Sequence, residues 1–188
     1  MLGEYDLDPQ IQDLVKRIVD SYNDRHRTRH IGNDYLPSRI ELVRITEMLL
    51  EVSYPGYYGR QDLSERNVNY HVGEMLPRLA QSLYLQVFRS LCHQNEIEGN
   101  YDPNGSSDQA LPIDVKARDI AAKFLDRIVD IRAMLALDVQ AAYDGDPAAV
   151  NTDEVIMTYP GLLAITVYRY AHELYRMNVP VMPRTMAE

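Results

Sequence analysis

Few side chains in this sequence fall at the spacings that catalytic or metal sites use. His26 and His30 lie four residues apart, as zinc ligands on a helix do, but no third ligand accompanies them. The basic segment Arg25–His30 is better interpreted as the solvated end of a helix, where cations complement the helix dipole, although its arginines could bind an anion. The sequence contains no GxSxG, HExxH, P-loop or CxxC motif. It therefore predicts neither a metal site nor a self-contained catalytic centre.

The remaining reactive residues upstream stand alone. His71 and His93 have no cluster of Cys, His, Asp and Glu around them, so packing or surface roles are expected. Cys92 follows Leu91 and is interpreted as a small buried apolar residue, not a nucleophile. A single thiol forms no internal disulfide, and the first residues, MLGEYDLD, have neither the basic flank nor the apolar segment of a signal peptide. A cytoplasmic location is expected.

Composition narrows the classes of partner. The 188 residues contain 19 Lys and Arg against 28 Asp and Glu, for a formal charge of −9. This charge repels phosphate backbones, so no nucleic-acid partner is expected. No uninterrupted apolar run approaches the ~20 residues that span a bilayer, so no membrane association is expected. The hydrophobic content of 46% is enough for a sizeable core in one domain or slightly more.

Apolar periodicity predicts an all-α protein, because no strand-like alternation of any length is present. The first helix is expected from Asp8 to about Asp24, since Asp8 can cap it and Pro9 suits the first helical position. Its apolar residues recur every three or four positions and would share one face: Ile11, Leu14, Val15, Ile18, Val19 and Tyr22.

A second helix should follow a reciprocal capping box at Ser38 and Glu41. It should end before Tyr54, because the residue before a proline avoids the α region. The segment Tyr54–Gly59 is interpreted as an aromatic corner that packs, not as a ligand site. The apolar face of this helix would comprise Ile40, Val43, Met48, Leu49 and Val52.

A long third helix is expected over residues 67–95. Pro77 would either kink this helix or mark a later start for it. Its stripe would comprise Val72, Met75, Leu76, Leu79, Leu83, Leu85, Val87, Phe88 and Leu91. Residues 96–113 concentrate Gly, Pro, Asn, Asp and Ser and should form a loop. This loop would separate an amino-terminal helical arm, residues 1–95, from a helical segment, residues 114–188.

The second segment should begin with a helix capped by Asp114. Asp130 is a candidate cap for another helix ending at Tyr143, so one continuous helix is not required. Gly145 would end that helix in the left-handed conformation. Asp146 and Pro147 would then restart the chain, with Asp146 capping residues 147–150 and Pro147 at a first helical position. Considered alone, the residues favour this capping role for Asp146.

The last apolar-periodic run begins at Tyr159 with the sequence Tyr-Pro-Gly and stops at Asn178. Arg169, His172 and Glu173 lie on it. A histidine on a packed helix is usually a hydrogen-bonded structural residue, so no catalytic role is assigned to these three.

Several of these stretches resemble a known family. The segments DVQAAYDGDPAA, YPGLLAITVYRYAHELYRMNVP and PRTMAE, within residues 138–188, resemble the end of the amino-terminal helical domain of bacterial serine O-acetyltransferases. LPSR at residues 36–39 and YPGYYG at residues 54–59 resemble the longer-armed branch of that family. In the family a left-handed β-helix of hexapeptide repeats follows this domain, and no such repeat follows here before Glu188. The resemblance therefore implies the helical part of an acetyltransferase, inactive alone.

The resemblance implies a role for Asp146 and Pro147. In the family the matching Asp holds the amino acid substrate and the matching Pro borders it. The whole enzyme would transfer an acetyl group from acetyl-CoA to L-serine, the first step of cysteine biosynthesis, with L-cysteine as feedback inhibitor. The catalytic residues and the acetyl-CoA groove would lie in the β-helix. No metal is implied.

The resemblance also implies partners. Helical domains of the family pair trimers into hexamers, so a homo-oligomer is expected, and cysteine synthase is a possible partner. One alternative of another class stays open: a free-standing all-α interaction or regulatory protein without catalysis.

Overall fold

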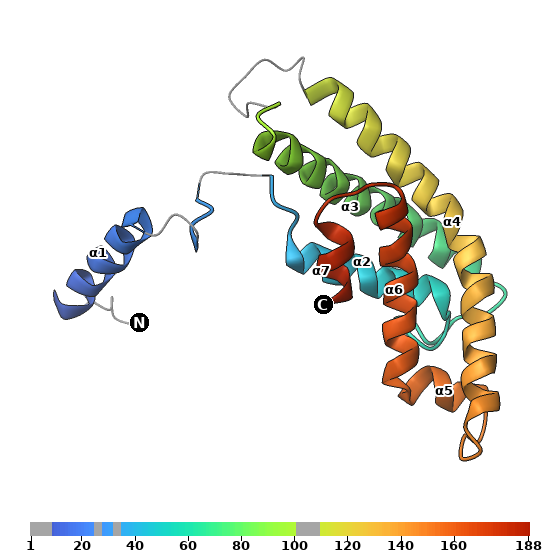
Figure 1. Cartoon of the computed structure of the whole chain (residues 1–188). Coiled ribbons are helices and arrows are strands. Elements are labelled where there is room, and N and C mark those ends of the chain that lie inside the picture. Colours follow the sequence, from blue (N-terminus) through green and yellow to red (C-terminus); the bar gives the residue numbers. More distant parts are fainter. Residues whose placement is uncertain (1–8, 25–27, 32–34, 101–109) are drawn as a thin grey trace. The chain divides into compact units, whose positions relative to one another are not determined.

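The computed structural model describes residues 9–24, 28–31, 35–100 and 110–188, and the chain divides into two units, Met1–Asp34 and Tyr35–Glu188. All regular elements in the described residues are helices, which confirms the all-α prediction; one isolated bridge joins Pro55 and Tyr58. The helices are α1 (Pro9–Asp24), α2 (Arg39–Ser53), α3 (Val68–Ile97), α4 (Ala110–Gly145), α5 (Thr152–Thr158), α6 (Pro160–Arg176) and α7 (Met182–Ala187) (Figure 1).

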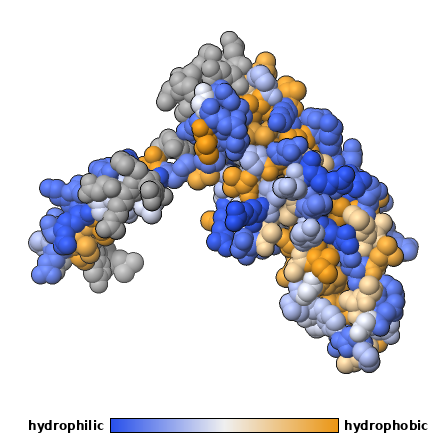
Figure 2. Space-filling view, viewed as in Figure 1, coloured by the Kyte–Doolittle hydropathy of each residue, from blue (hydrophilic) through white to orange (hydrophobic). Residues whose placement is uncertain are grey.

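The first unit contains α1, whose bounds match the expected helix. The proposed cap Asp8, and residues 25–27 of the basic segment with His26, lie outside the described residues. Figure 2 shows polar and apolar residues interspersed on the visible faces of the two units. The periodic apolar residues of α1 are each between 42% and 51% exposed: Ile11, Leu14, Val15, Ile18, Val19 and Tyr22. No described residue of the first unit covers this face.

The core of the second unit lies where α3 and α4 run side by side and α2 and α6 pack against them (Figure 1). Helix α7 folds back onto α6 and α2. Apolar side chains from these helices are almost completely buried, and the largest of them are Leu42, Ile45, Leu49, Leu79, Leu83, Phe124, Ile131, Leu135, Tyr170, Leu174 and Met182. Their burial supplies the main driving force for folding of this unit.

The face predicted for α2 is partly wrong. Ile40 and Val43 are 67% and 51% exposed, whereas Leu42 and Ile45 are buried. The buried stripe contains Leu42, Ile45, Leu49 and Leu50 and faces the neighbouring helices. The prediction failed because this helix has apolar residues around most of its circumference, so periodicity alone did not fix the buried side.

Only half of the predicted capping box forms. The Glu41 N–H donates to Ser38 Oγ at 3.4 Å, as expected. The Ser38 N–H donates to Gln86 Oε1 on α3 at 2.8 Å, and the Glu41 carboxylate pairs with Arg44. Gln86, which is distant in sequence, therefore accepts the Ser38 N–H that the capping box assigns to Glu41. The local sequence pattern did not predict this partner.

Helix α3 continues through Pro77, so the alternative that the helix starts there is wrong. Its residues Leu79, Leu83, Val87 and Leu91 are buried as expected, but Leu85 is 39% exposed. Cys92 is fully buried, and this burial raises the pKa of its thiol to about 11. The thiol is therefore neutral at physiological pH, which agrees with the predicted packing role.

Helix α4 is one uninterrupted element, which corrects two predictions. Its start at Ala110 makes residues 110–113 helical, and Asp114 is not a cap but accepts from Arg118 at 2.8 Å. Asp130 does not break the helix and pairs with Arg127 on its surface. Ile128 and Ile131, one on each side of Asp130, are both buried, so the core face continues without interruption.

The aromatic corner Tyr54–Gly59 packs as predicted. The hydroxyl of Tyr54 is 2.8 Å from Thr166 Oγ1 on α6, and the Tyr57 hydroxyl donates to Asp153 on α5 at 2.6 Å. The Tyr58 hydroxyl donates to the carbonyl of Ile156 at 3.2 Å. The end of α2 is thereby attached to α5 and α6.

Gly59 has two independent reasons to be glycine. Its φ of +65° is rarely adopted by residues with a side chain, and a Cβ there would lie 2.1 Å from Cδ of Glu51. Glu51 is held in place because its Oε1 accepts from the Arg60 N–H at 2.9 Å. Gly56 shares only the first reason, since its φ is +85° and a Cβ would meet nothing within 4 Å.

We expect Gly59→Ala to destabilise the chain more than Gly56→Ala. Each substitution costs about 1 kcal/mol through backbone strain. Gly59→Ala should cost about 1 kcal/mol more, because the displaced Glu51 loses its hydrogen bond to Arg60. Urea unfolding of both variants followed by circular dichroism measures the difference. Equal destabilisation would show that the contact with Glu51 has no energetic weight.

Candidate functional site

The strongest sequence candidate, Asp146, lies on the turn between α4 and α5. Helix α4 ends at Gly145, close to the expected residue, but not through a left-handed glycine: positive φ among described glycines occurs only at 56, 59 and 99. The chain does not resume a helix at Pro147 either. Residues 147 and 148 form a turn, and α5 begins at Thr152, where Asn151 Oδ1 accepts from the Glu154 N–H at 2.8 Å.

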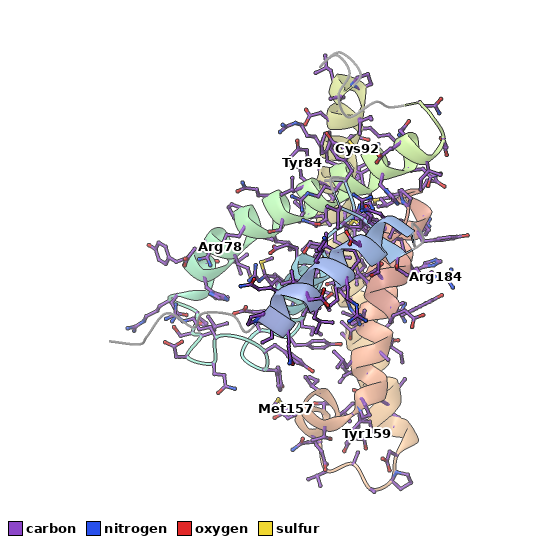
Figure 3. All side chains as sticks on the ribbon, turned by 90° about the vertical axis from the view of Figure 1, so that its left-hand side faces the viewer. Arg78, Tyr84, Cys92, Met157, Tyr159 and Arg184 are labelled. Carbon is purple, nitrogen blue, oxygen red and sulfur yellow. The ribbon has the colours of Figure 1, made fainter. Side chains whose placement is uncertain are left out.

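The half-buried carboxylate of Asp146 is held by two donors. Its Oδ1 accepts from the Ala148 N–H at 2.9 Å, which is the capping contact that the sequence predicted. Its Oδ2 accepts from the Tyr159 hydroxyl at 2.5 Å. Tyr159, labelled in Figure 3, lies between α5 and α6. The sequence interpretation used Tyr159 only as a helix start and missed this contact.

These contacts keep Asp146 ionised. The hydrogen bond from Tyr159, followed by the bond from Ala148, lowers the pKa of the carboxyl group against a small opposing effect of burial. The same bond raises the pKa of Tyr159 to about 12, so the phenol remains a donor at neutral pH. Among the described residues, no ion pair includes Asp146. Since a carboxylate has about four acceptor positions, this one can still receive a cationic donor.

Pro147 restricts the backbone conformation of the turn. It is exposed, has no N–H to donate and fixes its own φ, so the chain leaves Asp146 in one direction. The Ala149 N–H donates to the Asp146 carbonyl at 3.0 Å and closes the turn. Backbone N–H groups of the turn therefore bond both the Asp146 carboxylate and the Asp146 carbonyl.

The other residues singled out on α6 have structural partners. Arg169 makes a two-pronged ion pair with Asp138 on α4, with distances of 2.5 and 2.6 Å. Glu173 is buried and accepts from Arg127 Nε at 3.2 Å. The exposed His172 ring stacks between Tyr168 and Tyr175, with ring centroids 5.7 and 6.2 Å away. The two ion pairs fix α6 to α4, whereas the stacked rings all lie on α6, and none of these contacts converges on a reaction centre.

The described part of the chain offers neither a metal-binding cluster nor a membrane-spanning helix. Within it, no group of three or more His, Cys, Asp and Glu side chains is placed to hold a metal ion. None of its helices has the length and apolarity required to cross a bilayer. His71 Nε2 lies 3.0 Å from Glu51 Oε1, outside hydrogen-bond geometry. The described residues of the second unit thus form an all-α domain in which the turn after α4 presents the ionised Asp146 carboxylate, which takes part in no ion pair there.

Comparison with known proteins identifies the relatives of this domain. The chain is 34% identical over 155 residues to a plasmid-encoded serine acetyltransferase of Synechococcus elongatus, covering 81% of this chain and 46% of that protein. It is 54% identical over 55 residues to a serine acetyltransferase of Bacillus licheniformis, covering 29% of this chain and 26% of that protein. No protein-family model matches the chain.

Solved structures agree on the fold. A crystal structure of serine acetyltransferase isoform 3 of Entamoeba histolytica in complex with cysteine matches 93% of this chain and 53% of its own, with a TM-score of 0.54 and 24% identity. Serine acetyltransferase 1 of the same organism, in complex with L-cysteine, matches 95% of this chain and 58% of its own, with a TM-score of 0.54 and 20% identity. In sequence and fold this chain corresponds to the amino-terminal helical domain of serine acetyltransferases. It spans less than half of the curated relatives that it matches.

Removal of the Tyr159 hydroxyl tests the electrostatics of the turn. In Tyr159→Phe we expect the pKa of Asp146 to rise towards its usual value of about 3.9. Because the folded pKa of Asp146 is lowered, its contribution to stability is present above the unfolded pKa and lost as pH falls through the folded pKa. The variant should therefore show a weaker loss of stability below about pH 4.

Carboxyl carbon NMR titration measures the pKa directly, and urea unfolding between pH 2 and 7 measures the stability. Tyr57→Phe is the matched control, since it removes a tyrosine–carboxylate bond at Asp153 instead. An unchanged Asp146 pKa in Tyr159→Phe would contradict the contact.

Proposed function

We propose that this chain is the helical domain of a serine acetyltransferase, which converts acetyl-CoA and L-serine to O-acetyl-L-serine and CoA. In that reaction the serine hydroxyl oxygen attacks the thioester carbonyl, a base takes the hydroxyl proton and the CoA thiolate leaves. The base and the acetyl-CoA groove would lie in a β-helix outside this chain. Similarity to the Synechococcus elongatus enzyme over 81% of the chain supports the proposal.

The role proposed for this chain depends on the Asp146 carboxylate. Serine carries an ammonium group, and an ammonium–carboxylate hydrogen bond is shorter and stronger than a neutral one. Asp146 is ionised, oriented by Tyr159 and Ala148, and without a cationic partner in the described residues. The ammonium of L-cysteine would bind the same carboxylate, and two Entamoeba histolytica relatives were solved with cysteine. Pro147 would border the bound amino acid.

We expect Asp146→Asn, made in the natural protein that contains this chain, to lower kcat/KM for serine about 10- to 100-fold. The loss should appear mainly in the KM for serine, because the amide keeps the turn contact but not the charge. The KM for acetyl-CoA should stay unchanged, and inhibition by cysteine should weaken. Steady-state rates of CoA release measure these constants.

Asp144→Asn is the matched control, since Asp144 is exposed and accepts from its helix neighbour Gln140 at 2.8 Å. An unchanged serine KM and unchanged cysteine inhibition in Asp146→Asn would remove Asp146 from the site. The 188-residue chain alone should release no CoA. Turnover by that chain would place the reactive groups among these helices, and an inactive natural protein would favour the interaction protein without catalysis.

We also propose that α1 is a contact between copies of this chain. An isolated helix of 16 residues is marginally stable in water, and α1 exposes a face of six apolar residues. Burial of such a face against a symmetry-related copy would stabilise the helix and leave its polar side in solvent. The proposed assembly is a homo-oligomer of the trimeric or hexameric kind.

The double substitution Leu14→Asp/Ile18→Asp should lower the oligomeric state measured by light scattering after size-exclusion chromatography. Both positions lie within the apolar face, at 48% and 43% exposure, so the new charges would be buried in the contact. Lys16→Glu makes the same change in charge on the polar side of the same helix and should leave the mass unchanged. Equal masses for all three proteins would contradict a role for α1 in assembly.

A further inference from the structure

A cleft with no assigned role opens within the second unit, between the end of α2, α4 and α5. Its volume is about 310 Å³, at the lower end of the range for small-molecule sites. One wall is the aromatic corner at Tyr54 and Tyr57, and α5 contributes Thr152 and Ile156. Hydrogen bonds from Tyr57 and Tyr58 hold this corner against α5.

Helix α4 forms the other wall with one continuous face. Arg132, Leu135, Ala136, Val139 and Gln140 line the cleft and follow one another at helical spacing. Leu135 and Val139 are buried and form an apolar floor. Arg132 and Gln140 place polar groups two turns apart on the same wall. Such an apolar floor with a few polar groups is typical of small-molecule sites.

Arg132 is the charged group of the cleft, and its guanidinium is not neutralised. Its Nε donates to the Ser53 carbonyl at 3.4 Å, which orients the planar group without compensating its charge. In the described part of the chain no ion pair includes Arg132, whereas Arg169, on the neighbouring helix, has both prongs on Asp138. The exposed side chain of Arg132 leaves its terminal nitrogens accessible to an incoming anion.

We propose that this cleft binds a small organic monocarboxylate with a short apolar body. The guanidinium fork matches a carboxylate in geometry, and one positive charge offsets one negative charge. The buried floor at Leu135 and Val139 suits a hydrocarbon body better than a phosphate. At the far end, the Gln140 amide nitrogen already donates to Asp144 Oδ1 at 2.8 Å, so its carbonyl oxygen is the group left to accept from a ligand. This site is separate from Asp146, whose negative charge selects a cation.

The overall charge of the chain weakens the expected affinity of this cleft for a carboxylate. A formal charge of −9 opposes the approach of any anion, so affinity should come from the local fork and the floor. We expect a dissociation constant in about the millimolar range, as for a small ligand with one charged anchor.

The test titrates 4-methylpentanoate into the ¹⁵N-labelled 188-residue chain, followed by NMR. Saturable shifts are expected at the Arg132 Nε–H and at the amides of Tyr54 and Ala136. The neutral 4-methylpentanamide should bind about 10-fold more weakly or worse, because it lacks the charge. Arg132→Gln should weaken carboxylate binding about 10- to 100-fold. Arg66→Gln, which removes an exposed arginine elsewhere, should leave binding unchanged.

A second variant guards against a folding defect in Arg132→Gln. Ala136→Phe fills the cleft from an exposed position on α4, keeps Arg132 and should also abolish saturable binding. The proposal is overturned by equal shifts with the amide and the carboxylate, by tighter binding of inorganic phosphate, or by equal effects of Arg132→Gln and Arg66→Gln. It does not depend on the proposed acetyltransferase function, since no step of the test measures catalysis.

Discussion

The uninterrupted apolar face of α4 is the constraint on which the second unit depends. The helix extends about 54 Å at the standard rise per residue, and α2, α3, α5 and α6 all contact it. Its buried residues recur at helical spacing from Ala117 to Val139. A break inside this face would expose apolar surface worth about 25 cal/mol per Å². That cost explains why Asp130 stays within the helix and why the helix reaches the turn at Asp146 as one element.

The ion pair between Arg169 and Asp138 then fixes α6 against α4. Both side chains are partly buried, so loss of either partner would leave a charge poorly compensated. The buried ring of Tyr170 packs on Phe124, with centroids 5.9 Å apart, and adds a second attachment between the same helices. Because α6 begins next to Tyr159, these contacts also place the phenol that orients Asp146. The position of one carboxylate is thus determined by packing several turns away from it.

The outcome of the sequence predictions follows from how local each signal is. A proline at the first helical position predicted where α1 and α6 begin, and their ends lie within two residues of those expected. These signals could be interpreted from the sequence because they act within one helical turn. The partner of the Ser38 N–H could not be predicted, since Gln86 lies 48 residues away. Helix α5 was missed because it is short and carries little periodicity. The bond from Tyr159 to Asp146 was missed for the same reason, as it needs α5 to bring the two residues together.

The distribution of charges along α4 distinguishes the two candidate sites from their surroundings. Asp114 and Asp119 each have a basic residue four positions later and are neutralised by it. Asp146 lies beyond the helix end and is followed by Pro147 and alanines, and Arg132 has apolar residues three and four positions away on both sides. Neither Asp146 nor Arg132 therefore has an oppositely charged helix neighbour with which to form an ion pair. Sequence spacing alone does not identify such free charges, because Asp138 also lacks a local partner and finds Arg169 on another helix. The fold decides which isolated charges are neutralised by a distant residue and which stay available to a ligand.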